Sequence, residues 1–272
     1  MNSLENRMVD VLKDLKENHH VVGVKAEFEA EGTRMEEALR LKEVITKAGL
    51  DLTIKIGGCE AIKDMFDARS IGVTRIVAPM VETSYALKKY LEATHLVFPQ
   101  DERSNVEFLI NIETIDGYKN FDKMLALPKI KELNGIVLGR VDLTGSMGLN
   151  RDNVNDDAVF NIAQDLFKKA HSNNLECVIG GGVSSHSLPF FRKLPKDAFV
   201  DRYETRKVIF GCPDALGENA DKGILKAVGF ELMWLKNKRD FYKLIFEEDM
   251  QRIEMLQARY DKLIDLAGGK YK

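Results

Sequence analysis

The amino-acid sequence predicts an α/β protein, a TIM-type (β/α)8 barrel with an N-terminal helix and a C-terminal helical extension. Short apolar runs alternate with amphipathic stretches along the chain, which is the pattern of repeated β-then-α units around a parallel sheet. A polar residue follows nearly every expected strand. A barrel gathers all of its strand ends around one mouth, whereas an open sheet has its site at one switch point. The 272 residues, 44% of them hydrophobic, suffice for one such barrel.

The first half of the chain is expected to hold a leading helix and three β-then-α units. The strands are short apolar runs rich in β-branched residues, and they are expected over residues 21–28, 52–56 and 75–81. The helices show apolar residues at helical spacing, and they are expected over residues 4–16, 33–48, 59–70 and 84–93. Thr33 with Glu36 three residues later has the spacing of a capping box, so the second helix is expected to begin there.

The second half continues the alternation. Strands are expected over residues 108–112, 135–141 and 176–179, with one or two more within 199–210. Helices are expected near residues 118–125, 156–173 and 187–194. The sequence shows seven clear strands, so it does not decide whether an eighth strand closes the barrel.

The tail is expected to form a separate helical unit. We expect a catalytic barrel over residues 1–216 and a helical extension over residues 217–272. From Arg239 onward the positions of five residues approximate an a/d seam over about three heptads, namely Phe246, Ile253, Leu256, Tyr260 and Leu263. Such a helix either covers the barrel of its own subunit or packs on a second subunit. We expect the second arrangement, and therefore a homo-oligomer.

Composition excludes several classes of protein. The formal net charge is −3 and the sequence pI about 6.0, so no nucleic-acid partner is expected. The three cysteines are far apart and form no CxxC pair, which favours neither a disulfide framework nor a zinc knuckle and suits the reducing cytoplasm. The first 18 residues lack the apolar core of a signal peptide, and no run of apolar residues is long enough for a membrane span.

Two acids at strand ends predict a metal site. The apolar runs at 108–112 and 135–141 are followed by Glu113 and Asp142, and neighbouring parallel strands present such groups at the same end. Mg²⁺ and Mn²⁺ take oxygen ligands of this kind. Each acid could instead cap a helix or pair with a lysine, but two such strand ends together favour metal ligation. Asp116 and Glu82 are alternative ligands.

Further polar residues are expected at the same mouth. Lys55, at a strand end, could hold a substrate carboxylate, form a Schiff base, or only neutralise a nearby acid; a two-acid metal site makes the Schiff base redundant. Of Glu27 and Glu29, we expect Glu27 to point into the mouth as a general base or a water-mediated ligand, and Glu29 to be solvated.

The turn over residues 139–148 is rich in glycine and hydroxyl groups. Such a turn can aim backbone N–H groups at a carboxylate or phosphate, so Gly139 and Val141 are candidate substrate-binding positions. Arg140 is suited to a bidentate grip on a carboxylate. The glycines at 180–182 are compatible with either a phosphate cradle or a tight turn.

Three motifs resemble those of the HpcH/HpaI aldolase and citrate lyase beta-subunit family, a branch of the phosphoenolpyruvate/pyruvate barrel superfamily. Residues 112–114 with the following Asn120 are similar to its "IET…N" strand end. Residues 139–148 are similar to its "GPADL…G" loop, and residues 78–83 match its "IPMVxT" strand. The similarity runs from about residue 21 to residue 210, most of the chain.

This resemblance implies a metal-dependent carbon–carbon lyase. Glu113 and Asp142 would be the Mg²⁺ or Mn²⁺ ligands, and the metal would bind the carboxylate and keto oxygens of a 2-oxoacid. The implied reaction is the reversible aldol cleavage of a hydroxy-2-oxo acid through a metal-stabilised pyruvate enolate. Lys55 or Arg140 would orient the carboxylate, and Glu27 or a metal-bound water would move the proton.

The chain also departs from the family pattern. Lys55 stands where the family has a substrate-gripping arginine, no histidine follows the strand at 21–28, and Arg140 and Val141 replace a proline and an alanine. A helix takes the place of the family's N-terminal strand, so an altered or incomplete first strand is expected. Two alternatives therefore stay open: a citrate-lyase-like enzyme acting on an acyl-CoA ester or a sugar-derived acid, and a non-catalytic barrel used for binding.

Overall fold

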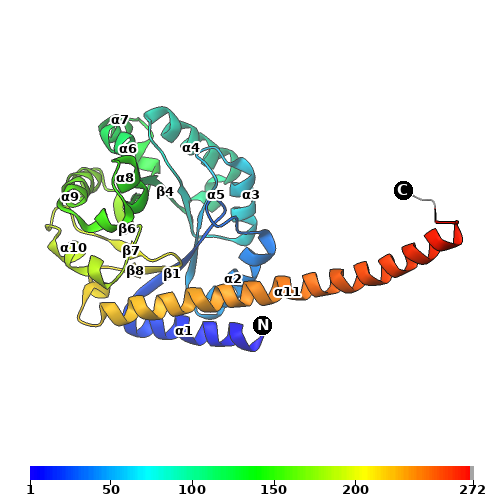
Figure 1. Ribbon diagram of the computed structural model, residues 1–272. Helices are drawn as coiled ribbons and strands as arrows, with labels where there is room; N and C mark the ends of the chain where they lie inside the picture. The colour runs from blue at the N-terminus through cyan, green and yellow to red at the C-terminus, as the bar shows by residue number, and fades with distance from the viewer. Residues whose placement is uncertain (270–272) are drawn as a thin grey trace. The chain divides into compact units, whose positions relative to one another are not determined.

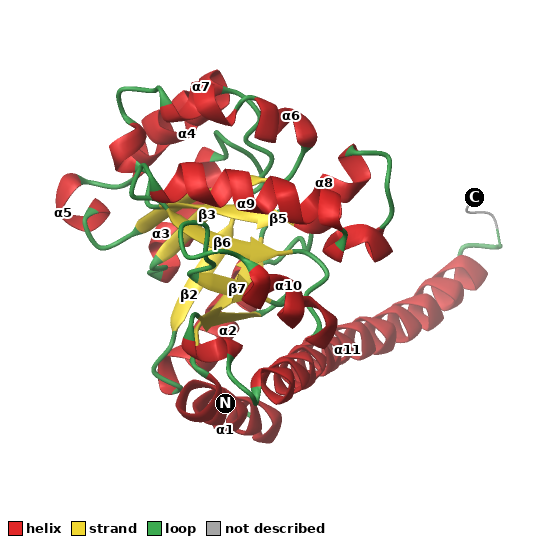
Figure 2. Cartoon of the chain, turned by 90° about the vertical axis from the view of Figure 1, so that its left-hand side faces the viewer, coloured by secondary structure: helices red, strands yellow, loops and turns green. Residues whose placement is uncertain are grey.

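The structure, a computed structural model, describes residues 1–269 and contains a closed barrel of eight strands (Figures 1 and 2). The strands follow one another around the barrel in sequence order. They are β1 (Val21–Glu27), β2 (Asp51–Lys55), β3 (Arg75–Ala78), β4 (Glu107–Ile112), β5 (Gly135–Gly139), β6 (Glu176–Gly180), β7 (Arg202–Glu204) and β8 (Val208–Gly211). The predicted barrel is confirmed, and the segment at 199–210 supplies its last two strands.

The eighth strand closes the barrel in reverse. β1 to β7 pair in parallel, whereas β8 is antiparallel to both β7 and β1. Only residues 205–207 join β7 to β8, and a connection this short can link only antiparallel strands, because parallel pairing requires a crossover. β1 is a complete strand of seven residues paired on both sides, rather than the altered or incomplete first strand expected, and its pairing with β8 includes a register shift between Val21 and Gly23.

Helices surround the strands and connect them (Figure 2). The α-helices of the described residues are α1 (Ser3–His19), α2 (Met35–Lys47), α3 (Ile62–Ile71), α4 (Ser84–Val97), α5 (Gln100–Arg103), α6 (Ile115–Lys119), α7 (Phe121–Leu125), α8 (Arg140–Ser146), α9 (Asp157–His171), α10 (Leu188–Lys193) and α11 (Ala220–Leu266). Short 3-10 helices are η1 (Ile130–Glu132), η2 (Arg151–Asn155), η3 (Ser185–Ser187) and η4 (Asp214–Leu216). None of the helices within residues 1–269 has the length and hydropathy of a membrane span.

Two element boundaries differ from those expected. α2 begins at Met35 rather than at residue 33, because the carboxylate of Glu37, not Glu36, accepts the backbone N–H of Arg34 at 3.3 Å. β3 ends at Ala78, since Met80 adopts a φ of 45°, which an extended strand does not allow.

The chain divides into two compact units. The first comprises Met1–Glu231 and contains the whole barrel, and the second begins at Leu232. The second unit consists of the remaining length of α11 and the residues after it. The helical extension expected from residue 217 therefore corresponds to α11, which contributes residues to both units.

An apolar layer fills the middle of the barrel. Four neighbouring strands each contribute one buried residue to it, namely Val77, Leu109, Val137 and Val178. Because side chains on a strand point to alternate sides, the residues two positions away on each strand also face the interior. Toward the carboxyl ends of β4, β5 and β6 these are Asn111, Gly139 and Gly180. The packed layer therefore forms a floor for whatever site lies at that end.

A charged cluster lies on the other side of this floor, at the amino ends of the strands. Glu107 on β4 accepts hydrogen bonds from Arg75 at 2.5 Å and from Arg202 at 3.0 Å, and Arg202 also pairs with Glu176. Burial alone would raise the pKa of Glu107, but the two guanidinium groups outweigh it and hold the pKa below its usual value. The cluster links four strands, β3, β4, β6 and β7, by charge rather than by apolar packing.

Replacing Glu107 should destabilise the barrel in a pH-dependent way. A carboxylate whose pKa is lowered by folding stabilises the native state above its unfolded pKa of about 4.3, and that contribution disappears as pH falls toward the folded pKa. Glu107→Gln should therefore lower the free energy of unfolding at pH 7 by about 2 kcal/mol, and the difference should shrink as pH falls through the folded pKa of Glu107. Urea denaturation at several pH values measures this.

The matched control is Glu102→Gln, which removes the exposed partner of Arg69. That variant should change stability far less than Glu107→Gln. Equal effects of the two substitutions at pH 7, or a Glu107→Gln effect that is constant with pH, would contradict this account of the cluster.

Candidate active site

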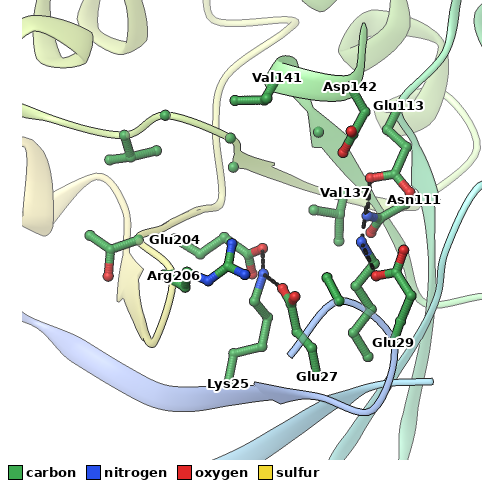
Figure 3. A pocket seen from close by; sticks show the side chains of 18 of the residues that line it. Lys25, Glu27, Glu29, Asn111, Glu113, Val137, Val141, Asp142, Glu204 and Arg206 are labelled. Carbon is green, nitrogen blue, oxygen red and sulfur yellow. Dashed lines mark hydrogen bonds and ion pairs between the residues drawn. The ribbon is translucent and has the colours of Figure 1, made fainter. Parts of the chain in front are cut away.

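A polar cavity of about 450 Å³ opens at the carboxyl ends of the strands. Its walls come from the ends of six strands and the loops after them (Figure 3). Among the residues predicted from the sequence, the cavity is lined by Glu27, Lys55, Glu113, Gly139, Val141 and Asp142. Barrel enzymes carry their sites at this end, because loop and strand-end residues from many units meet there.

Glu113 follows β4 and is 2% exposed. Its Oε1 accepts the backbone N–H of Met80 at 2.9 Å, and its Oε2 accepts the side-chain N–H of Asn111 at 2.6 Å. Burial raises the pKa of Glu113 and outweighs Lys55, Asn111 and Met80, which lower it, while the charge of Asp142 adds to the rise. The carboxyl group is thus fixed in position and lacks full compensation for its charge.

Asp142 lies in the first turn of α8, on the loop after β5, and is exposed. Figure 3 shows its carboxylate directed toward that of Glu113 across one side of the cavity. The structure therefore brings together the two acids that the sequence placed at neighbouring strand ends. The alternatives named from the sequence, Asp116 and Glu82, do not line this cavity.

Two glycines make room for the acids. A Cβ on Gly139 would lie 2.6 Å from Oε2 and 2.8 Å from Cβ of Glu113. A Cβ on Gly180 would lie 3.1 Å from the Glu204 side chain. Both glycines end strands and face the interior, so their missing side chains create space that the glutamates occupy.

Lys55, at the end of β2, bridges two carboxylates. Its Nζ lies 3.0 Å from Glu29 and 3.6 Å from Glu113. Burial alone would lower the pKa of Lys55, but Glu113, Glu29 and Glu27 outweigh it and raise the pKa. Lys55 is therefore a cation at neutral pH, and the neutral amine that a Schiff base requires is disfavoured. Glu29 was expected to be solvated; it lines the cavity instead, because it pairs with this lysine.

Lys25 on β1 belongs to the same wall and escaped the sequence analysis. It is buried, pairs with Glu204 of β7, and lies 3.2 Å from Glu27. Burial would lower its pKa, but the two carboxylates outweigh this and raise the pKa. Glu27 shows the reverse: burial would raise its pKa, but Lys25 and Lys55 hold it below the usual value. The i, i+2 spacing of Lys25 and Glu27 on one strand was the signal available in the sequence.

Arg140 does not enter the cavity. It is fully buried, and its guanidinium donates to the carbonyl oxygens of Gly180 and Gly181 at 3.0 Å and to Asn155 Oδ1 at 2.7 Å. The group also lies over the ring of Phe191 at 5.0 Å. Its donors hold the loops after β5 and β6 together, so the carboxylate-gripping role predicted for Arg140 has no support in this geometry.

Two other arginines line the cavity. Strand alternation puts Arg206 on the same face as Glu204, which left open whether it pairs structurally or lines the mouth; in the structure it lines the cavity from the turn between β7 and β8, and its Nε lies 3.5 Å from Glu31. Arg151, in η2, is exposed, and the sequence did not indicate it. No histidine among residues 1–269 lines the cavity.

The donor set at Glu113 fits a hard divalent cation. Glu113 and Asp142 supply carboxylate oxygens, which Mg²⁺ and Mn²⁺ prefer. Asn111 also lines the cavity, and its side-chain oxygen is buried without a hydrogen-bond partner. A cation between the two acids would relieve the repulsion that helps raise the pKa of Glu113.

A second group of possible metal ligands lies near the amino ends of β6 and β7, formed by His171, Cys177 and Asp201. Here Asp201 accepts the N–H of Cys177 at 2.7 Å and lies 2.9 Å from His171 Nε2. Burial raises the pKa of the Cys177 thiol, whereas a metal binds the thiolate. Hydrogen bonds between neighbouring elements account for the closeness of these three side chains, so we assign the metal site to the cavity and not to this group.

The fold and the cavity together define a barrel protein with an acidic site at the carboxyl ends of its strands. Comparison of the sequence with known families specifies the class of barrel protein. The profile of the HpcH/HpaI aldolase/citrate lyase family matches residues 29–180, more than half of the chain. The chain belongs to this family, which indicates an enzyme of aldolase or citrate lyase type. No curated protein gives a significant match to it.

Solved structures share the fold at low sequence identity. A HpcH/HpaI aldolase/citrate lyase family protein from Burkholderia cenocepacia J2315 superposes with a TM-score of 0.60 at 13% identity, covering 75% of this chain and 93% of the other. A HpcH/HpaI aldolase from Desulfitobacterium hafniense DCB-2 gives 0.57 at 11% identity over 72% and 82%. The citrate synthase SbnG gives 0.58 at 15% identity over 86% and 90%.

Because Glu113 lies so close to Gly139, an alanine at this position should destabilise the protein far more than an alanine at the nearby Gly145. Gly139→Ala must displace Glu113, because the added methyl meets both its carboxylate and its Cβ, so we expect a loss of about 1–3 kcal/mol in unfolding free energy. Gly145→Ala, on α8 with nothing within 4 Å of the new methyl, should be neutral or stabilise the chain. Chemical denaturation compares the two, and similar stabilities would refute the packing described here.

Proposed function

We propose that the chain is a divalent-metal-dependent carbon–carbon lyase of the aldolase type, acting on a hydroxy-2-oxo acid. The observation that carries the proposal is the convergence of Glu113 and Asp142 on one side of the cavity, beside a lysine cation. Family membership supplies the class of reaction. The pairing of acids and base-like groups in one cavity supports an enzyme rather than a binding barrel.

Glu113 and Asp142 are the proposed ligands of Mg²⁺ or Mn²⁺, with Asn111 beside them. When bound, such a metal supplies Lewis-acid stabilisation of the negative charge that develops on a 2-oxoacid as the carbon–carbon bond breaks. Hydrogen bonds from Met80 and Asn111 hold Glu113 in one orientation, so this carboxylate needs little rearrangement to act.

Lys55 is the proposed carboxylate-binding residue. Its raised pKa keeps it cationic, and its position between Glu29 and Glu113 places that charge at the edge of the ligand site. A substrate carboxylate would compete with Glu29 for the ammonium group. We propose that Gly139 and Val141, at the start of α8, contact the substrate through their backbone.

Glu27 is the proposed proton-transfer group. It lines the cavity from the β1 side and is ionised, because Lys25 and Lys55 lower its pKa. A lowered pKa makes a carboxylate a weaker base, so proton transfer through Glu27 would be efficient only if substrate binding weakens its interactions with both Lys25 and Lys55.

A larger acidic substrate is the second candidate. Arg151 and Arg206 add positive charge to the cavity wall beyond Lys55, which favours an acid with a further anionic group, such as an acyl-CoA ester or a sugar-derived acid. Turnover of pyruvate plus aldehydes, compared with turnover of acyl-CoA esters and sugar-derived acids, separates the two candidates.

Loss of the proposed metal ligands should abolish metal-dependent turnover. Asp142→Ala and Glu113→Gln each remove one carboxylate, so we expect Mn²⁺ affinity to fall at least about tenfold while the barrel still folds. Calorimetric titration with Mn²⁺, together with a lyase assay before and after EDTA, measures both effects. Asp116→Asn, an acid outside the cavity, is the control. Full activity in EDTA would exclude the proposal.

Removing the Lys55 charge should raise the affinity for the metal and lower the affinity for the substrate. Lys55→Met deletes a cation 3.6 Å from Glu113, so Mn²⁺ should bind more tightly, whereas a 2-oxoacid should bind more weakly and raise KM about tenfold or more. Lys55→Arg should restore part of the substrate affinity, and Lys42→Met, on the outside of the barrel, should change neither. Unchanged KM in Lys55→Met would remove Lys55 from the substrate site.

A further inference from the structure

From Leu232 onward α11 carries an exposed apolar stripe. Leu232, Leu235, Phe246, Ile253 and Leu256 all have more than half of their surface exposed. The stripe follows a regular alternation of three and four residues, which is the pattern of coiled-coil a and d positions. The a positions are Leu232, Arg239, Phe246 and Ile253, and the d positions are Leu235, Tyr242, Asp249 and Leu256.

Only two of these eight positions are charged, Arg239 at a and Asp249 at d. Arg239 contacts the neighbouring Asp240 at 2.7 Å, but both side chains are largely exposed, so this pair is weak. A charge in an otherwise apolar seam lowers stability unless it meets an opposite charge, and it thereby selects one alignment of the helices.

We propose that this part of α11 pairs with the same helix of a second copy of the chain, as an antiparallel coiled coil centred near Leu244. In that alignment Arg239 faces Asp249 of the partner subunit. The other positions then meet as apolar layers: Tyr242 with the partner's Phe246, Leu235 with the partner's Ile253, and Leu232 with the partner's Leu256.

The alternatives leave charges unmatched. A parallel pair would place Arg239 against the partner's Arg239, and Asp249 against the partner's Asp249. An antiparallel pair shifted by one heptad would place Asp249 against an apolar residue, either the partner's Phe246 or the partner's Leu232. A helix from another protein would have to provide matching charges of its own, whereas a second copy of this chain already provides both.

Disulfide cross-linking of the full chain tests the alignment. Ile245→Cys lies next to the centre of the antiparallel pair, Leu263→Cys lies at a d position that meets its own copy only in a parallel pair, and Lys262→Cys faces outward as the control. The wild-type chain reports the background from its three native cysteines. We expect Ile245→Cys to cross-link at least about tenfold faster than Lys262→Cys, and Leu263→Cys to match the control.

Charge exchange in the Ile245→Cys chain tests the pairing of Arg239 with Asp249. Arg239→Asp or Asp249→Arg alone creates like charges in the seam and should slow cross-linking by about tenfold, whereas the two together should restore the rate. Circular dichroism verifies that each variant is folded. The proposal is overturned if Ile245→Cys is no faster than Lys262→Cys, if Leu263→Cys is the fastest, or if the double exchange fails to restore the rate.

Discussion

The structure of the site depends on one electrostatic constraint, the compensation of acidic side chains crowded at the mouth of the barrel. Glu27 and Glu204 are compensated by the buried Lys25, and Glu29 by Lys55. The carboxylates of Glu113 and Asp142 face each other, and the Lys55 ammonium lies 3.6 Å from Glu113. Burial, with the charge of Asp142 in addition, raises the pKa of Glu113, and a cation bound between the two acids would compensate their charge.

An apolar layer in the barrel interior separates the charged residues of the cavity from a second charged cluster at the amino ends of the strands. The apolar layer that contains Leu109 and Val137 lies between the cavity and the cluster around Glu107. The charges at the amino ends of the strands pair with one another across neighbouring strands, whereas those at the carboxyl ends line the cavity. The same strands carry both, since Glu107, Leu109 and Asn111 occupy successive inward positions of β4.

The sequence predicted the barrel and its acidic end, because apolar runs and strand-end acids are local patterns. It could not show that β8 runs antiparallel, because the pairing direction follows from the short turn at residues 205–207 and not from the apolar run itself. Lys25 was missed because a lysine inside a strand is unremarkable until its partner Glu204, 179 residues away, is known. Arg140 was misplaced because alternation along the chain does not reveal that its guanidinium turns back onto the Gly180 and Gly181 carbonyls.

The most direct test of the central claim is the location of Mn²⁺ by anomalous diffraction from crystals of the full chain. The account predicts one strong peak within coordination distance of both Glu113 and Asp142, at the open end of the barrel. A peak at His171, Cys177 and Asp201 instead, or an empty cavity at saturating Mn²⁺ with both carboxylates ordered, would contradict it.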